Sequence, residues 1–129
     1  MDARRAPAYR GRVRILLFAA LAGLVAGVQA QPHSQGECRE GGDFIRNAAL
    51  ARDAGVTREF FVNRLEEDFL VIRAFPPALR WFAHDASDEA FLRAAVQEVF
   101  DAPAGSEDHR LAFLERCVRR AERLAQRGV

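Results

Sequence analysis

Two cysteines, Cys38 and Cys117, are the residues of this 129-residue chain whose chemistry is easiest to interpret. In an exported protein an even number of cysteines favours a disulfide, and two cysteines allow only one intramolecular pairing. The alternative is a redox-active pair, which usually has its thiols close together as C-x-x-C, and these two are far apart in the sequence. We therefore expect a structural bond, which by the chain-entropy relation stabilises the fold by roughly 4–5 kcal/mol.

Histidine is the other residue type that could do chemistry, and the chain has three: His33, His84 and His109. None pairs with another at the spacing of metal ligands, so we expect no metal site. His84 with Asp85 could act in general acid-base catalysis if a cleft and partners surrounded the pair. Because the pair falls at the end of a predicted helix, we expect His84 to interact with the negative helix terminus instead.

Motifs that would indicate an enzyme are missing from the sequence. It contains no G-x-S-x-G, no phosphate-cradling glycine loop and no dinucleotide fingerprint. The acidic run Glu66-Glu67-Asp68 cannot converge like a pair of catalytic carboxylates, because neighbouring residues of a helix point in different directions. We interpret it as a solvated face, and we predict a protein without cofactor or enzymatic activity.

The residues Arg80, Trp81 and Phe82, with His84 close behind, form a candidate partner surface. Tryptophan and arginine are over-represented at the energetic centres of protein interfaces. Core packing is the competing interpretation for Trp81, because it is the only tryptophan and a small core needs large side chains. We favour core packing for Trp81 and keep the partner surface as the alternative.

The N-terminal 30 residues read as a secretory signal peptide. The apolar run from Ile15 to Val28 is 14 residues long, shorter than the roughly 20 that a membrane-spanning helix needs. Five arginines precede it, and Val28-Gln29-Ala30 places small residues at the −3 and −1 positions of a cleavage site. We expect cleavage before Gln31 and a periplasmic or secreted protein that meets the membrane only during export. An uncleaved anchor is the alternative.

The mature chain would keep 99 residues, enough for one small domain. Its 14 arginines and 17 acidic residues give a net charge of −3, which provides no general attraction to nucleic acid. The charge is uneven, with −7 over residues 31–109 and +4 over residues 110–129. The basic end could neutralise the acidic body, pair with a second copy or contact an acidic partner.

Helical periodicity dominates the mature chain, and the predicted fold is an all-α bundle of four or five helices over residues 38–129, after a flexible leader at 31–37. The first helix should begin near Cys38 or Asp43, and the chain offers glycines, prolines and capping residues at the other boundaries. In the second predicted helix, after Thr57, residues 70–72 widen the apolar stripe. This suggests that the helix is buried on more than one side. The expected boundaries are an end at Gly55, a cap at Thr57, a stop at Pro76-Pro77, a short third helix at 78–84, a fourth helix capped by Asp85 or Ser87, a fifth capped by Ser106 with Leu111 in its apolar stripe, and an end at Gly128.

Several short motifs together carry a family resemblance. They are Cys38, then Arg52-Asp53-Ala54-Gly55, then Val99-Phe100-Asp101-Ala102-Pro103, then Cys117. This layout resembles a set of small exported proteobacterial helical proteins with the pattern C…RD-x-G…V-[YF]-x-x-P…C. The resemblance implies an exported helical domain with one disulfide and implies no particular activity. Within it, we interpret Arg52 and Asp53 as a helix-end ion pair or cap rather than a recognition site. The plan is also similar to that of periplasmic acid-stress chaperones.

Three functions remain open at this point. The first is a non-enzymatic periplasmic or secreted protein that binds another periplasmic protein or a second copy of itself. The second is an acid-responsive chaperone-like protein, since full protonation would move the mature net charge from −3 to about +17 and loosen the bundle. The third is a small hydrolase that uses His84.

Overall fold

A computed structural model describes residues 31–128, so the predicted signal peptide at 1–30 lies outside the described residues, as does residue 129. The regular secondary structure of this part of the chain is entirely helical, with no strand, which confirms the all-α prediction. Among these residues no helix has the length and apolar character that crossing a membrane would require. The elements are α2 (Gln35–Asp53), α3 (Arg58–Arg73), the 3₁₀ helix η2 (Pro77–Leu79), α4 (Ala86–Asp101) and α5 (Ser106–Arg127).

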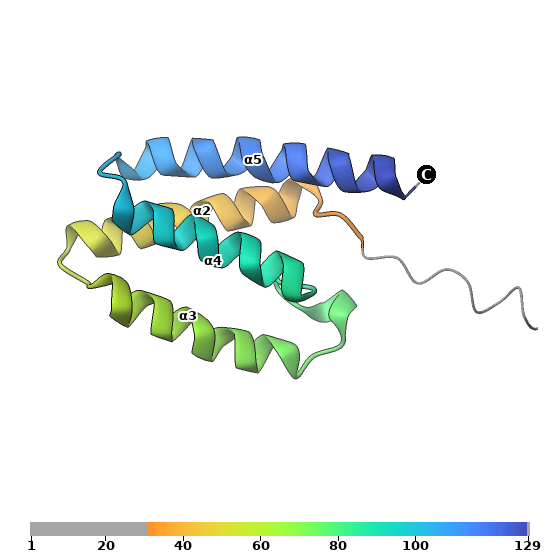
Figure 1. Ribbon diagram of the computed structural model, residues 1–129, viewed down its shortest axis with the longest axis horizontal. Coiled ribbons are helices and arrows are strands. Elements are labelled where there is room, and N and C mark those ends of the chain that lie inside the picture. Colours follow the sequence, from red (N-terminus) through yellow and green to blue (C-terminus); the bar gives the residue numbers. More distant parts are fainter. Residues whose placement is uncertain (1–30, 129) are drawn as a thin grey trace, which may run out of the picture.

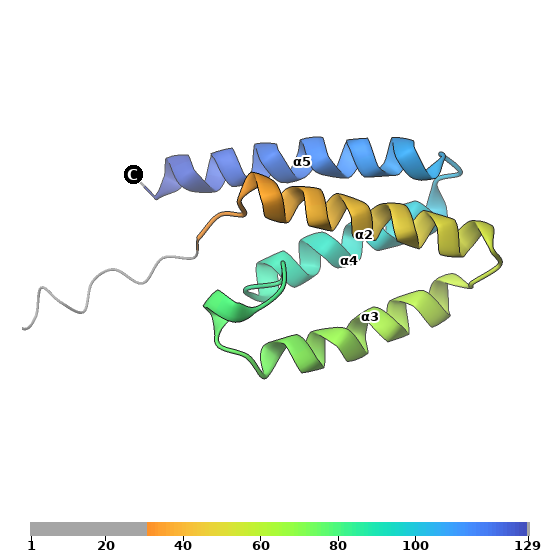
Figure 2. The same cartoon turned by 180° about the vertical axis from the view of Figure 1, so that it is seen from behind.

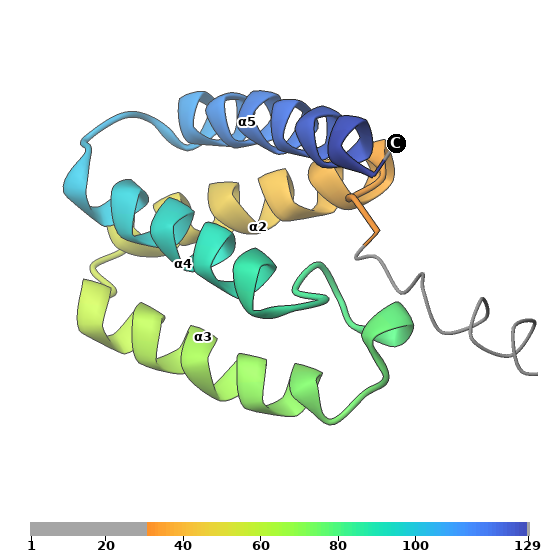
Figure 3. The same cartoon turned by 45° about the vertical axis from the view of Figure 1, so that its right-hand side comes forward.

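The helices are arranged in three layers (Figures 1 and 3). α2 and α4 lie between α5 on one side and α3 on the other. The view from behind shows α2 running directly along α5 (Figure 2), and this is the most extensive helix contact, whereas α3 packs chiefly against α4. The largest fully buried side chains are Ile45, Phe69, Phe82, Leu92, Val96, Val99 and Phe113.

α2 begins at Gln35, earlier than the predicted start at Cys38 or Asp43. The reason is a capping box: the Glu37 amide donates to the Ser34 hydroxyl at 3.1 Å, and the Ser34 amide donates to the Glu37 carboxylate at 3.2 Å. The predicted flexible leader therefore extends too far, because 35–37 is helical and His33 is buried.

Gly41 explains why a glycine pair is acceptable inside α2. A methyl group at Gly41 would lie 2.7 Å from a ring atom of Phe113 and 2.9 Å from one of Phe82, which is too close for a real contact. The missing side chain lets α2 and α5 approach each other. Cys38 and Cys117 meet in this contact with their Cα atoms 5.6 Å apart and form the predicted disulfide.

The turn into α3 agrees with the sequence prediction. Gly55 has a φ of +95°, a conformation that glycine adopts without strain, and the Thr57 hydroxyl accepts a hydrogen bond from the Phe60 amide. Leu65 and Phe69 are buried against α4 as expected.

The outer face of α3 differs from the prediction. Leu70 and Val71 are each 64% exposed, so the expectation that this helix is buried on more than one side is wrong. The physical reason is the layer order: α4 covers one face of α3, and the described residues include no element on its other face.

The segment after α3 also differs. The predicted helix at 78–84 is only the single 3₁₀ turn η2, and Asp85, rather than Ser87, caps α4 by accepting from the Asp88 amide. Phe82 is buried at a φ of +50°, a left-handed conformation that is rare for a bulky side chain.

α5 shows two smaller corrections. Gly105 is its N-cap and makes no side-chain cap, while the predicted cap Ser106 is the first helical residue. Its buried face carries His109, Phe113 and Cys117, so Leu111 lies outside the stripe and is half exposed. Gly128 caps the C-terminus as predicted.

Candidate functional site

A pocket of about 860 Å³ opens where the segment between α3 and α4 faces the first turns of α2. Its walls come from two stretches that are far apart in the sequence. One stretch precedes and begins α2, and the other runs from η2 to the cap of α4. The lining residues are Gln31, Glu37, Glu40, Pro77, Ala78, Leu79, Arg80, Trp81, Phe82, His84 and Asp85.

One wall of the pocket is apolar and open to solvent. Leu79 is 71% exposed and Trp81 is 37% exposed, although large apolar side chains are usually buried. Phe75, just before η2, is also exposed, and with Leu70 and Val71 it extends the apolar surface along the end of α3. Exposed apolar side chains gathered in one region are common where a protein meets another molecule, which makes this region a candidate site.

The charged groups at the pocket are mainly negative. Glu37, Glu40 and Asp85 supply three carboxylates to the lining. The only guanidinium there belongs to Arg80, which donates to the backbone carbonyl oxygens of Phe75 at 2.8 Å, His84 at 3.0 Å and Arg73 at 3.2 Å. Arg80 therefore holds the segment in shape, and the pocket offers carboxylates and apolar surface to a ligand.

Phe82 fixes the back of the pocket. Its ring stacks on the His33 imidazole with centroids 4.0 Å apart, and its carbonyl oxygen lies 2.6 Å from His33 Nε2. Non-glycine residues in the left-handed region cost about 1–3 kcal/mol and are concentrated at functional sites. The strained turn at Phe82 is what brings His84 next to the start of α4.

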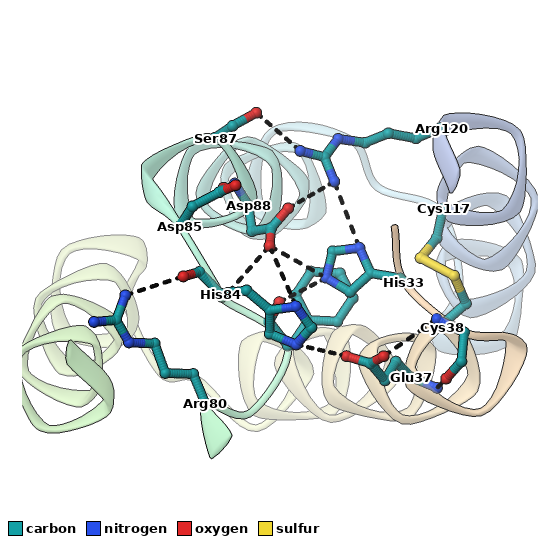
Figure 4. A network of polar contacts seen from close by, with 12 residues as sticks. His33, Glu37, Cys38, Arg80, His84, Asp85, Ser87, Asp88, Cys117 and Arg120 are labelled. Carbon is teal, nitrogen blue, oxygen red and sulfur yellow. Dashed lines mark hydrogen bonds and ion pairs between the residues drawn. A yellow bond between two sulfur atoms is a disulfide. The ribbon is translucent and has the colours of Figure 1, made fainter. Parts of the chain in front are cut away.

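A polar cluster that shares Glu37 and His84 with the pocket lining is drawn in Figure 4. His84 Nε2 lies 2.7 Å from a carboxylate oxygen of Glu37, and Arg120 donates to Asp88 Oδ1 at 2.8 Å. His33, His84 and Asp88 bring one possible metal-ligand atom each to within 4.8 Å of one another. The cluster joins the chain before α2 to α4 and α5.

The four residues predicted as a partner surface are only partly together at the surface. All four line the pocket, but the side chain of Phe82 is buried, and only Arg80, Trp81 and His84 keep part of their surface exposed. Trp81 fits both core packing and a surface position. Its ring packs edge-on against that of Phe44, with the centroids 5.5 Å apart, and 37% of the residue is still exposed.

His84 does not occupy the position that the sequence predicted. It follows a non-helical turn and precedes the N-terminus of α4, so it meets no negative helix end. It is paired with Glu37 and not with Asp85, whose carboxylate caps α4. The proposed His84-Asp85 catalytic pair is therefore not formed.

Arg52, Asp53, Gly55 and Pro103, the motif residues of the family resemblance, lie away from the pocket at the other end of α2. Arg52 pairs with Asp53 and donates to the carbonyl oxygens of Val99 at 2.7 Å and Ala102 at 3.0 Å. Another of its N–H groups reaches the carbonyl of Ala104 at 2.8 Å. These bonds hold α2 to the α4–α5 loop that contains Pro103, and they support the structural interpretation of the pair.

Sequence reasoning missed most of the polar cluster. His33, Asp88 and Arg120 come from three distant positions, and no local pattern relates them. The position of Glu37 could have been predicted. Ser34-x-x-Glu37 is a capping-box pattern, and it places the Glu37 carboxylate at the start of α2.

Ion pairs hold α3 against α4 beside the pocket. Arg73 donates to Glu89 with Nε 2.9 Å from Oε2, and Arg93 donates to Glu66 with Nη2 3.1 Å from Oε2. The hydrogen bonds from Arg73 lower the pKa of Glu89 below its ordinary value. Burial opposes this shift, and the positive charges of Arg73, Arg93 and Arg80 add to it.

Comparison of the chain with known protein families, curated proteins and solved structures finds no match.

Proposed function

We propose that this chain is an exported, non-enzymatic binding protein that captures a partner protein in the periplasm or outside the cell. The observation that carries the proposal is the pocket, whose lining combines exposed Leu79 and Trp81 with the carboxylates of Glu37 and Glu40. This combination fits a peptide segment with a large apolar side chain beside a lysine or arginine.

The pocket supports binding rather than catalysis. A histidine paired with a carboxylate, such as His84 with Glu37, can act as a base, but the hydroxyl of Ser34 accepts the Glu37 amide in the helix cap and has no hydrogen bond to His84 in the described part of the chain. A nucleophile activated by a base would need the two side chains in hydrogen-bond contact. The partner is a protein of the same compartment or a second copy, whose basic α5 has the required charge.

Site-specific crosslinking tests where the partner binds. A photoreactive side chain placed at Leu79 should capture a protein in living cells, whereas the same group at Phe60, exposed in the first turn of α3 at the end away from the pocket, should not. The crosslinked segment of the partner should contain a basic residue next to a large apolar one. Equal capture from both positions, or capture of an acidic segment, would contradict the proposal.

Fluorescence of Trp81, the only tryptophan, gives a direct readout of the pocket. A short arginine-leucine peptide should change its emission in a saturable manner, and a glutamate-leucine peptide of the same length should not. Glu40→Gln should weaken the arginine peptide several-fold because an opposing carboxylate is lost. The matched control is Glu59→Gln, an exposed acid in the first turn of α3, which should leave the binding unchanged.

Export is a separate part of the proposal. The positive N-terminus, the short apolar run and the disulfide all support it. Expression of the full chain in a Gram-negative host should yield periplasmic protein that begins at Gln31. A cytoplasmic protein that still begins at Met1 would contradict this part.

A second candidate, the acid-responsive chaperone, is favoured by the ion pairs between α3 and α4. Loss of the Arg73–Glu89 ion pair in acid would loosen a helix that already exposes Leu70 and Val71. Light scattering of an aggregating client protein at pH 3 and pH 7 tests it. Protection at pH 3 alone would support this function, and unchanged aggregation at both values would reject it.

A further inference from the structure

His33, His84 and Asp88 form a cluster that the binding proposal does not use. Each comes from a different segment: His33 precedes α2, His84 precedes α4 and Asp88 lies in the first turn of α4. Their three nearest ligand atoms lie within 4.8 Å of one another (Figure 4). Two imidazoles and one carboxylate are donors that suit zinc and other divalent first-row transition ions, and not calcium or magnesium, which prefer oxygen.

His84 is oriented as a ligand. A proton on its Nε2 makes the 2.7 Å contact with the Glu37 carboxylate a hydrogen bond, and this leaves the lone pair of Nδ1 free. Nδ1 lies on the side of Asp88, 4.0 Å from Oδ2. Histidines that bind metal ions usually donate their other N–H to a carboxylate in this manner, which fixes the tautomer and the ring.

Asp88 is also held with one oxygen available to an ion. Arg120 donates to Oδ1 at 2.8 Å, and the backbone N–H of His84 donates to Oδ2 at 3.0 Å. Oδ2 lies 3.6 Å from Nε2 of His33 and faces both imidazoles. The arginine thus orients the carboxylate, although its positive charge opposes a nearby cation and limits the affinity.

His33 must change its proton position to take part. Its Nε2 donates to the Phe82 carbonyl at 2.6 Å, so the proton of the neutral ring lies on Nε2. Binding through Nε2 requires the tautomer with the proton on Nδ1, and it exchanges that hydrogen bond for the bond to the ion. The Nδ1 proton would then face Nη1 of Arg120, which lies 3.5 Å from Nδ1, so the guanidinium must shift when the ion binds. The carbonyl oxygen of Phe82 would then face the ion as well.

We propose that His33 Nε2, His84 Nδ1 and Asp88 Oδ2 bind one divalent transition-metal ion of the zinc class, with Glu37 and Arg120 as positioning residues. Bonds of about 2.0–2.2 Å to zinc require the three atoms to move closer together. His84 is the most exposed of the three and lies on a turn, so it can supply much of this movement. The inference stands independently of the peptide that the pocket binds.

Calorimetric titration of the chelator-treated, oxidised mature chain with Zn²⁺ tests the site. We expect one ion per chain, and visible absorption from bound Co²⁺ should report ligands of low coordination number. His84→Gln should weaken binding at least tenfold. Glu37→Gln should weaken it by about 10-fold to 100-fold through loss of orientation, while glutamine still completes the capping box.

Two controls separate this site from general attraction to acidic groups. Glu40→Gln removes a carboxylate one turn further along α2 and should leave the zinc affinity unchanged. In the unaltered chain, zinc should shift the imidazole NMR signals of His33 and His84 and leave those of His109 in place, which requires no variant to fold. Absence of saturable binding, full affinity in His84→Gln, or equal shifts at His109 would overturn the proposal.

Discussion

The α2–α5 pair and the α3–α4 pair are held together by different forces. A disulfide joins α2 to α5, and Gly41 lets the two helices approach around the buried ring of Phe113. By contrast, α3 buries Leu65 and Phe69 against α4, adds two arginine-glutamate pairs, and leaves an apolar outer face exposed.

This difference indicates which helix should open first. Local stability in a protein follows buried apolar contact, and segments with little of it open first. The pocket lies at the end of the weakly held helix, against the first turns of the firmly held one. The pocket therefore lies between a firmly held wall and a weakly held wall.

Loss of the disulfide should reduce the stability of the fold the most. Replacing Cys38 and Cys117 together by alanine should lower the free energy of unfolding by roughly 4 kcal/mol, because the unfolded chain regains its freedom. Urea unfolding of the variant and of the parent chain, with and without reductant, measures this. A loss of less than about 1 kcal/mol would show that the α2–α5 contact does not depend on the bond.

Gly41→Ala should cause the next largest loss of stability. Its methyl group would overlap the rings of Phe113 and Phe82, and overpacking of this kind costs about 1–3 kcal/mol. Gly36→Ala in the same helix is the matched control, since no atom lies closer than 3.8 Å to its added carbon. Thermal unfolding should show a loss for the first variant and no loss for the second.

Glu89→Gln should destabilise the α3–α4 contact, and the effect should depend on pH. The folded-state pKa of Glu89 is lowered by Arg73, so its stabilisation is complete above the ordinary value of 4.5 and disappears as the pH falls through the lower folded-state value. The urea midpoints of parent and variant should differ at pH 7 and converge in acid below pH 4.5.

Glu98→Gln is the matched control for this prediction. Glu98 also lies on α4 and pairs with an arginine of another helix, Arg116, but both side chains are largely exposed. Exposed ion pairs contribute little, so its midpoint should stay close to that of the parent chain. Equal losses in both variants would mean that burial of Glu89 has no particular role.

Leu79→Ser should have the smallest effect on stability. Because Leu79 is mostly exposed, the free energy of unfolding should change by no more than about 0.5 kcal/mol. The same variant should weaken the arginine-leucine peptide measured by Trp81 fluorescence. A large loss of stability with unchanged peptide binding would place Leu79 in the core instead of the pocket.

The sequence predicted the features that depend on local chemistry. The left-handed glycine at Gly55, the Thr57 cap and the single possible cysteine pairing follow from neighbouring residues and counts, and the structure confirms them. The Ser34 capping box was equally local and was overlooked, which shifted the start of the first helix.

Features that depend on layer order could not be read from periodicity. Leu70 and Val71 are apolar at helical spacing, and only the position of α3 at the edge of the bundle leaves them exposed. His33 lies close to His84 and Asp88 because of the strained turn at Phe82. No glycine or proline at that turn would have allowed its prediction from the sequence.

Hydrogen exchange measured by mass spectrometry tests the central claim, that α2 and α5 form a firmly held pair and that α3, beside the pocket, is held less firmly. Amides of α3 should exchange faster than those of α2 and α5 at pH 7, and after correction for intrinsic rates this difference should grow below pH 4.5. Exchange of all four helices as one cooperative unit at both pH values would contradict it.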